Sequence, residues 1–215
     1  MKILTMPQYS QEWWSARRGI PTSSEAKRII TPATGKPAEG ADTYAAELIA
    51  ASLGWFSSFK GTDDTERGTM LEPEARRWLK LQTGHTSHQV GFCLSDCGRY
   101  GASPDGLLDD GTPVEIKAPA LNTFIKWAIA KELPKDHKAQ CHMHMYVTGA
   151  DRCMFMAYTD HPAIDNLMIE VRRDDFTAKL GEYLLAFCDR LDQLRRELTG
   201  DEYDVLFPAN VQAKP

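Results

Sequence analysis

A short apolar run at residues 114–119 carries two charged side chains, and this run most constrains how the chain can fold. If the run is a strand, Glu115 and Lys117 share one face, and Ile116 points the other way into the core. The residues just before it, Asp109-Asp110-Gly111, are a signal for a tight hairpin turn. The sequence therefore predicts a hairpin whose second strand carries charges into an apolar setting.

Such a hairpin would bring Asp105, in the sequence Ser103-Pro104-Asp105-Gly106, beside Glu115 and Lys117. Taken singly, these residues are ordinary, because Asp before Gly is a common turn residue and a Glu-x-Lys strand often makes a surface ion pair. Charges inside an apolar run are costly, however, unless they bind a metal or a partner. Two carboxylates and an ammonium together suit metal-assisted attack of water on a phosphodiester.

The composition is that of an ordinary globular protein, with 215 residues, 26% charged and 42% hydrophobic. We expect a single domain over residues 1–215, with its core at about 10–199 and an irregular tail at 200–215. A net charge of −5 argues against indiscriminate binding to polyanions. The absence of a long apolar run predicts a cytoplasmic protein without a membrane span or signal peptide, and five scattered cysteines fit reduced thiols.

Hydrophobic periodicity predicts an α/β fold, with helices packed on a mixed central sheet. We expect Asp42 to cap one helix, and Asp174 or Asp175 to start the last one. Trp13 and Trp14 are expected to seat the first helix in the core rather than to stack on bases. The predicted helices span about 10–18, 23–30, 42–53, 66–83, 121–131, 135–148 and 174–199, and the predicted strands span about 87–94, 98–103, 106–109, 112–118, 152–159 and 167–172.

Five patterns follow one another over about residues 13–149. They are Trp13 to Glu25 (W-x-x-x-R-x-G-x-x-T-x-S-E), Gly68 to Arg76 (G-x-x-x-E-x-x-A-R), Ser103 to Leu107, Glu115 to Pro119, and Ala139 to Gly149. Together they resemble the phage lambda-type exonuclease family of the PD-(D/E)xK nuclease superfamily. The resemblance implies that fold and an enzyme that digests linear double-stranded DNA from 5′ to 3′, releasing 5′-mononucleotides and leaving 3′ overhangs.

The same resemblance assigns roles to individual residues. It makes Asp105 and Glu115 ligands of a catalytic Mg²⁺, or Mn²⁺ as a substitute, with the carbonyl of Ile116 as a further ligand. Lys117 would orient or deprotonate the attacking water and stabilise charge. Glu72 would serve a second metal or its waters, although a Glu four residues before Arg76 is also an ordinary helix-surface pair.

Arg17, Ser24 and Ser103 match positions that hold the 5′-terminal phosphate in this family, and Arg18 is an alternative to Arg17. A guanidinium and hydroxyls suit such a group, although Ser24 could also be a simple helix cap. The family motif Q-x-Q reads Gln140-Cys141-His142 here, which places His142 and Gln140 beside the metal site.

The resemblance also implies a ring-shaped homotrimer, a single-strand annealing protein as partner, and a phage or prophage recombination setting in a bacterial host. Three other readings stay open. The first is a restriction- or repair-type endonuclease on the same core, and the second is an inactive DNA-binding module. The third is a zinc site built from the histidines and cysteines at His137, Cys141, His142, His144 and Cys153.

Overall fold

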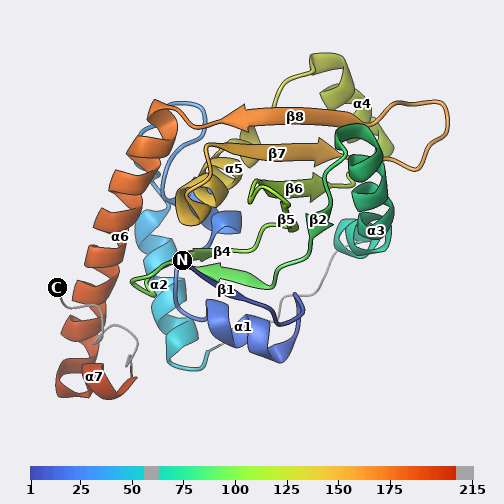
Figure 1. Cartoon of the computed structure of the whole chain (residues 1–215). Coiled ribbons are helices and arrows are strands. Elements are labelled where there is room, and N and C mark those ends of the chain that lie inside the picture. The colour runs from blue at the N-terminus through green and yellow to red at the C-terminus, as the bar shows by residue number, and fades with distance from the viewer. Residues whose placement is uncertain (56–62, 207–215) are drawn as a thin grey trace.

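The computed structural model describes residues 1–55 and 63–206 (Figure 1). The helices and strands follow the predicted order closely. They are β1 (Lys2–Leu4), α1 (Gln11–Arg17), the 3₁₀ helix η1 (Ser23–Arg28), α2 (Ala41–Ser52), α3 (Asp63–Thr83), β2 (Ser87–His88), β3 (Phe92–Leu94), β4 (Gly101–Ala102), β5 (Gly106–Leu108), β6 (Pro113–Lys117), α4 (Leu121–Ala130), α5 (Lys135–Thr148), β7 (Arg152–Ala157), β8 (Leu167–Arg172), α6 (Asp175–Thr199), η2 (Gly200–Glu202) and α7 (Tyr203–Leu206).

The strands form two sheets. The larger one has the order β2-β5-β6-β7-β8, in which β6 and β7 are parallel and the other neighbours are antiparallel. Helices α4 and α5 make the crossover between the two parallel strands. The smaller sheet, β1-β3-β4, is antiparallel throughout. The predicted α/β fold with a mixed central sheet is confirmed.

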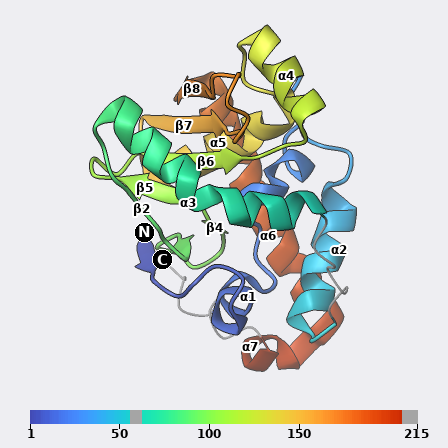
Figure 2. The ribbon, with the colours of Figure 1, turned by 90° about the vertical axis from the view of Figure 1, so that its right-hand side faces the viewer.

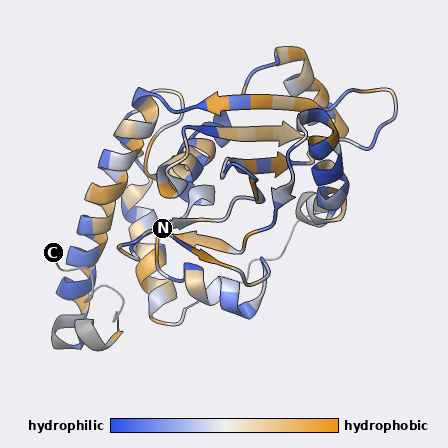
Figure 3. Ribbon diagram, in the orientation of Figure 1, coloured by the Kyte–Doolittle hydropathy of each residue, from blue (hydrophilic) through white to orange (hydrophobic). Residues whose placement is uncertain are grey.

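Helices cover both faces of the larger sheet (Figure 2). On one face, Ala75 and Leu79 of α3 pack with Val114 and Ile116 of β6. On the other face, Phe124 of α4 and Cys141 and Met145 of α5 pack on β7 around Phe155. Figure 3 shows the apolar strands between helices whose outer sides are polar. Because side chains alternate along β6, burial of Ile116 under α3 turns Glu115 and Lys117 toward α5.

The predicted hairpin is present between β5 and β6. Gly111 has φ = 83°, a left-handed conformation that glycine adopts without steric cost, and its N–H donates to the carbonyl of Leu108. The pairing aligns Gly106 with Val114. The N–H of Asp105 donates to the carbonyl of Val114 at 2.9 Å. One residue further along the hairpin, Asp105 therefore comes to lie opposite Glu115.

Helix α6 also follows its predicted pattern. Asp174 caps it, and the side chains of Asp174 and Thr177 make the reciprocal bonds of a capping box. Leu180, Leu184 and Leu191 are buried against α2 and α5, as the predicted apolar stripe requires. No helix in residues 1–55 and 63–206 is long and apolar enough to cross a membrane.

Some boundaries differ from the prediction. The segment predicted as a helix at 23–30 is the 3₁₀ helix η1, and the strand predicted at 87–94 divides between the two sheets as β2 and β3. Asp42 does not cap α2, because Gly40 holds that position and Asp42 lies in the first turn. Strand β1 was not predicted. Residues 200–206 form η2 and α7 rather than an irregular tail, and 207–215 lie outside the described residues.

Candidate active site

A large cleft opens between α1, α3 and the edge formed by β5 and β6. The residues that line it include nearly every predicted site residue: Arg17, Ser24, Glu72, Ser103, Asp105, Glu115, Ile116, Lys117 and Gln140. These come from segments far apart in the sequence. Their common position in this cleft is consistent with the prediction that they form one site. His142 is the exception, because it does not line the cleft.

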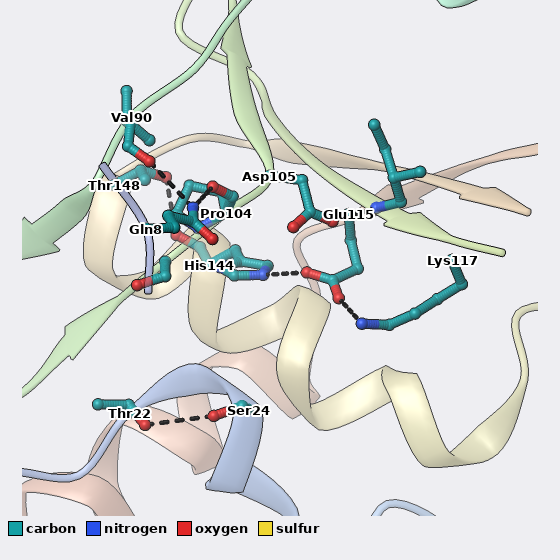
Figure 4. Close-up of polar contacts among 12 residues, drawn as sticks. Gln8, Thr22, Ser24, Val90, Pro104, Asp105, Glu115, Lys117, His144 and Thr148 are labelled. Atoms are coloured by element: carbon teal, nitrogen blue, oxygen red, sulfur yellow. Dashed lines mark hydrogen bonds and ion pairs between the residues drawn. The ribbon is translucent and has the colours of Figure 1, made fainter. Parts of the chain in front are cut away.

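Asp105 and Glu115 lie side by side at the floor of the cleft. One oxygen of Asp105 accepts a hydrogen bond from the N–H of Ile116 at 2.5 Å. Glu115 is 1% exposed, and its two oxygens have different partners: Lys117 Nζ lies 2.5 Å from Oε1, and His144 Nε2 donates to Oε2 at 2.7 Å (Figure 4). The hairpin thus holds two carboxylates and an ammonium together in a largely buried setting.

If Asp105 and Glu115 are both ionised, their two negative charges exceed the single positive charge of Lys117. Burial would raise the pKa of Glu115, but Lys117 and the hydrogen bond from His144 outweigh it and lower that pKa to about 2. Burial and the negative charge of Glu115 raise the pKa of Asp105 well above its ordinary value. A divalent cation beside both groups would allow both to ionise. The donor set of carboxylate oxygens and a nearby carbonyl therefore fits Mg²⁺ or Mn²⁺.

Glu72 lies at the cleft and is paired with Arg76. It forms an ion pair with Arg76 one turn later on α3, as expected for a helix-surface pair. It also lines the cleft, and its negative charge contributes to the raised pKa of Asp105. The side chain is 21% exposed. Glu72 is thus placed to act on the Asp105 side of the site while Arg76 holds it.

The structure corrects the placement of His142. Its ring is 2% exposed, hydrogen-bonds Thr177 Oγ1 at 2.7 Å and packs against Phe176, on the side of α5 that faces α6. Burial lowers its pKa to about 4. The histidine that reaches the carboxylates is His144, two residues further along the same helix. The reason is helical geometry, since residues two apart point to different sides of a helix.

The guanidinium of Arg17 hydrogen-bonds both hydroxyls that are predicted to bind phosphate, those of Ser24 and Ser103. Nη1 donates to Ser103 Oγ at 2.9 Å, and Nη2 donates to Ser24 Oγ at 3.1 Å and to Thr22 Oγ1 at 3.2 Å. Thr22 is the fixed threonine of the W-x-x-x-R-x-G-x-x-T-x-S-E pattern, but no role was predicted for it. No carboxylate forms an ion pair with Arg17 in the described part of the chain. Burial lowers the pKa of Arg17 to about 10, which leaves it charged at neutral pH. A charged, partly desolvated guanidinium with hydroxyls around it can bind an anion.

The two tryptophans of α1 behave differently. Trp13 is 4% exposed, and its Nε1 donates to the carbonyl of Gly91 and to Ser103 Oγ. Trp13 therefore anchors α1, as predicted. The guanidinium of Arg17 lies 4.1 Å from the centre of its ring, so Trp13 also supports Arg17. Trp14 is 45% exposed and lines the cleft, so the prediction that it is a core residue is wrong.

The histidines and cysteines considered as a zinc site do not point toward a common position. Cys141 and Cys153 pack in the apolar layer under α4, whereas His142 faces α6 and His144 faces Glu115. Across residues 1–55 and 63–206, no group of three or more His, Cys, Asp or Glu side chains is arranged to hold a metal.

Comparison with known proteins gives a consistent result. Residues 12–151 match the model of the YqaJ-like viral recombinase domain. The fold is similar to LHK-Exo, an alkaline exonuclease from Laribacter hongkongensis. The complex of that enzyme with dAMP is 28% identical with a TM-score of 0.73, and a second structure of it is 27% identical with a TM-score of 0.72. Each match covers 88% of this chain and 98% of the other.

A phage-related exonuclease from Haemophilus somnus 129PT, 16% identical with a TM-score of 0.67, shares the fold over 84% of this chain and 96% of its own. No curated protein matches the sequence. The matches confirm an α/β nuclease fold of the PD-(D/E)xK type and the resemblance to viral recombination exonucleases.

Proposed function

Because the chain belongs to the YqaJ-like viral recombinase domain family, we propose that it is a Mg²⁺-dependent exonuclease that digests linear double-stranded DNA from 5′ ends. It would release 5′-mononucleotides and leave 3′ single-stranded overhangs for recombination by annealing. The family and the alkaline exonuclease matches support a nuclease of the viral recombination type.

The position of Arg17 is the observation that supports digestion from the 5′ end. Its guanidinium and the hydroxyls of Ser103, Thr22 and Ser24 form an anion site in the same cleft as Asp105 and Glu115. Ser103 links the anion site to the carboxylates, because it accepts a hydrogen bond from Arg17 and lies two residues before Asp105. A terminal phosphate bound there would place the adjoining phosphodiester near the carboxylates. The cut would then begin at a 5′ end.

Each residue of the site has a separate role in the proposed reaction. Asp105, Glu115 and the carbonyl of Ile116 would hold the metal, with Glu72 beside them for a second metal or its waters. When bound, the metal would polarise the phosphate and lower the pKa of water. Burial acts to lower the pKa of Lys117, but the charges of Glu115 and Asp105 outweigh it and raise that pKa. Lys117 therefore stays an ammonium that orients the water and stabilises negative charge as the bond breaks.

His144 and Gln140 complete this arrangement. His144 holds Glu115 from the side opposite Lys117, and Gln140 lines the cleft on the same helix. We further propose a single nuclease domain that assembles into a homotrimeric ring in the bacterial cytoplasm, with a single-strand annealing protein as partner. A ring would suit a chain of net charge −5, because enclosure holds DNA without a tight electrostatic grip.

A restriction- or repair-type endonuclease is the second candidate, because the carboxylates and lysine alone do not specify an end. Digestion of a 5′-phosphorylated linear duplex and of a covalently closed circle, each with Mg²⁺ and with EDTA, separates the two. We expect degradation of the linear duplex only, and only with Mg²⁺. Nicking of the circle would support the endonuclease, and binding without cleavage of either DNA would support an inactive DNA-binding module.

A further inference from the structure

Tyr9 has a backbone conformation that tyrosine rarely adopts. Its φ is 67°, in the left-handed region that favours glycine, and the only other described non-glycine residue with a positive φ is Lys131 at the C-terminal end of α4. A helix end commonly places a residue in that region, whereas Tyr9 lies in a turn before α1. The ring is 54% exposed and lines the cleft. Strained residues that persist are concentrated at functional sites.

The neighbours of Tyr9 hold it in this conformation. The side-chain amide of Gln8 donates to the carbonyls of Val90 and Pro104, both at 2.9 Å, which fastens the turn to the residue before Asp105 (Figure 4). On the other side, Ser10 caps α1 by accepting from the N–H of Trp13. The ring of Tyr9 itself packs against Trp13, with 5.2 Å between ring centres. The turn is therefore fixed at both ends, and the ring has little freedom to leave the cleft.

Tyr9 lines the same cleft as Arg17 and Asp105. Its ring packs on Trp13, which the guanidinium of Arg17 also contacts, and Gln8 ties the turn to Pro104, the residue before Asp105. The negative charges of Asp105 and Glu72 act on its hydroxyl. Burial and the two carboxylates raise the pKa of Tyr9, so the phenol is neutral at physiological pH. A DNA strand with one phosphate at Arg17 and the next at Asp105 would have a single nucleotide between them. The base of that nucleotide would lie in the cleft that Tyr9 also lines.

We propose that Tyr9 binds the base of the 5′-terminal nucleotide by stacking its ring on the base, an inference that rests on the proposed exonuclease function. An exposed aromatic ring near a phosphate-binding arginine can stack on a base with little sequence preference, because every base has a π-face. Trp13 backs the ring, so little conformational freedom is lost on binding. Stacking at this point would orient the terminal nucleotide so that its 3′ phosphodiester reaches the carboxylates.

A purely structural role makes a different prediction. Tyr9 precedes the cap of α1 and packs on Trp13, so the ring could serve only to seat that helix. In that case Tyr9→Gly should weaken the binding of all DNA ends equally. If the ring is a base platform, Tyr9→Gly should weaken only the binding of ends that carry a terminal base. The melting temperature does not separate the two roles, because the substitution relieves the strained backbone but also removes the contact with Trp13.

The test compares two 5′-phosphorylated duplexes, one normal and one whose 5′-terminal nucleotide is abasic, with the normal duplex lacking its 5′-phosphate as reference. Binding is measured by fluorescence anisotropy in EDTA, which prevents cleavage, for wild type, Tyr9→Gly and Tyr9→Phe. We expect wild type to bind the normal end about five- to tenfold more tightly than the abasic end, the low end of the range for base–aromatic stacking. Tyr9→Phe should keep this difference, and Tyr9→Gly should abolish it. All three proteins should still prefer 5′-phosphorylated ends.

Three results would overturn the inference: equal binding of both duplexes by wild type, a difference that survives in Tyr9→Gly, or loss of the difference in Tyr9→Phe, which would assign the effect to the hydroxyl. Failure of the proposed function looks different. In that case wild type would show no preference for 5′-phosphorylated ends, or would not digest linear duplex with Mg²⁺, whatever residue occupies position 9.

Discussion

The hydrogen bond from His144 to Glu115 offers the sharpest test of how the candidate site is built. Both side chains are buried, at 0% and 1% exposure, and 2.7 Å separates Nε2 from Oε2. His144→Ala removes the donor and leaves a buried, charged oxygen without that partner. A hydrogen bond to a charged group contributes about 1.5–3 kcal/mol, so the free energy of unfolding near pH 7 should fall by about that amount. Denaturant unfolding in EDTA measures it.

The same substitution should weaken metal binding. Loss of a group that orients a metal ligand typically costs about 10- to 100-fold in metal affinity or activity. We expect His144→Ala to raise the Mg²⁺ concentration needed for half-maximal cleavage by at least about tenfold on that basis, and calorimetry with Mn²⁺ should show the same shift in binding. His144→Gln should recover most of both losses, because its side-chain amide can donate from nearly the position of Nε2.

His142→Gln is the matched control, since it changes the neighbouring histidine on α5 that contacts Thr177 instead of Glu115. It should leave the Mg²⁺ dependence unchanged. The reasoning is refuted if His144→Ala alters neither stability nor metal binding, or if the two substitutions shift the Mg²⁺ dependence equally.

The remaining predictions concern charge in the cleft and at His142. Lys117→Ala should abolish cleavage but retain metal binding in calorimetry, whereas Asp105→Ala should lose both; loss of binding in the lysine variant would contradict the assigned roles. Arg17→Ala should reduce the preference for 5′-phosphorylated ends by about 10- to 100-fold, the value of a charged hydrogen bond, while cleavage continues; an unchanged preference would place the phosphate elsewhere. Burial keeps His142 neutral by lowering its pKa from 6.5 to about 4, so the unfolded chain binds a proton first as pH falls. Stability should therefore drop by up to about 3 kcal/mol between pH 6.5 and 4, and His142→Gln should remove that part of the slope in denaturant titrations.

Much of the fold is predictable because local signals and burial agree. The turn at 109–111 sets the register of β5 and β6, and the alternation of Glu115 with Ile116 gives the orientation of β6. The capping residue Asp174 marks where α6 begins, and the apolar stripe that follows marks its buried face. Strand β1 has no such signal, because its three residues are held only by pairing with β3, about ninety residues later in the chain.

The site is less predictable for a specific reason. Helix α5 is buried nearly all round, including Cys141, His142, Met143, His144 and Met145. A helix without a polar side gives no hydrophobic periodicity from which to choose the face toward Glu115. The motif therefore indicated His142, whereas packing selects His144. Tyr9 was missed for a related reason, since a positive φ at a tyrosine depends on tertiary contacts that no local pattern encodes.

The contacts of the N-terminal turn also bear on when activity can arise during synthesis. Gln8 bonds carbonyls 82 and 96 positions away, and Arg17 bonds Ser103, 86 positions away. At about 5–20 residues per second, the ribosome needs roughly 5–20 s to make the intervening chain. The anion site and the carboxylates therefore cannot meet in a short nascent chain, and His144 emerges later still. We expect nuclease activity to appear late in translation, after His144 has left the ribosome.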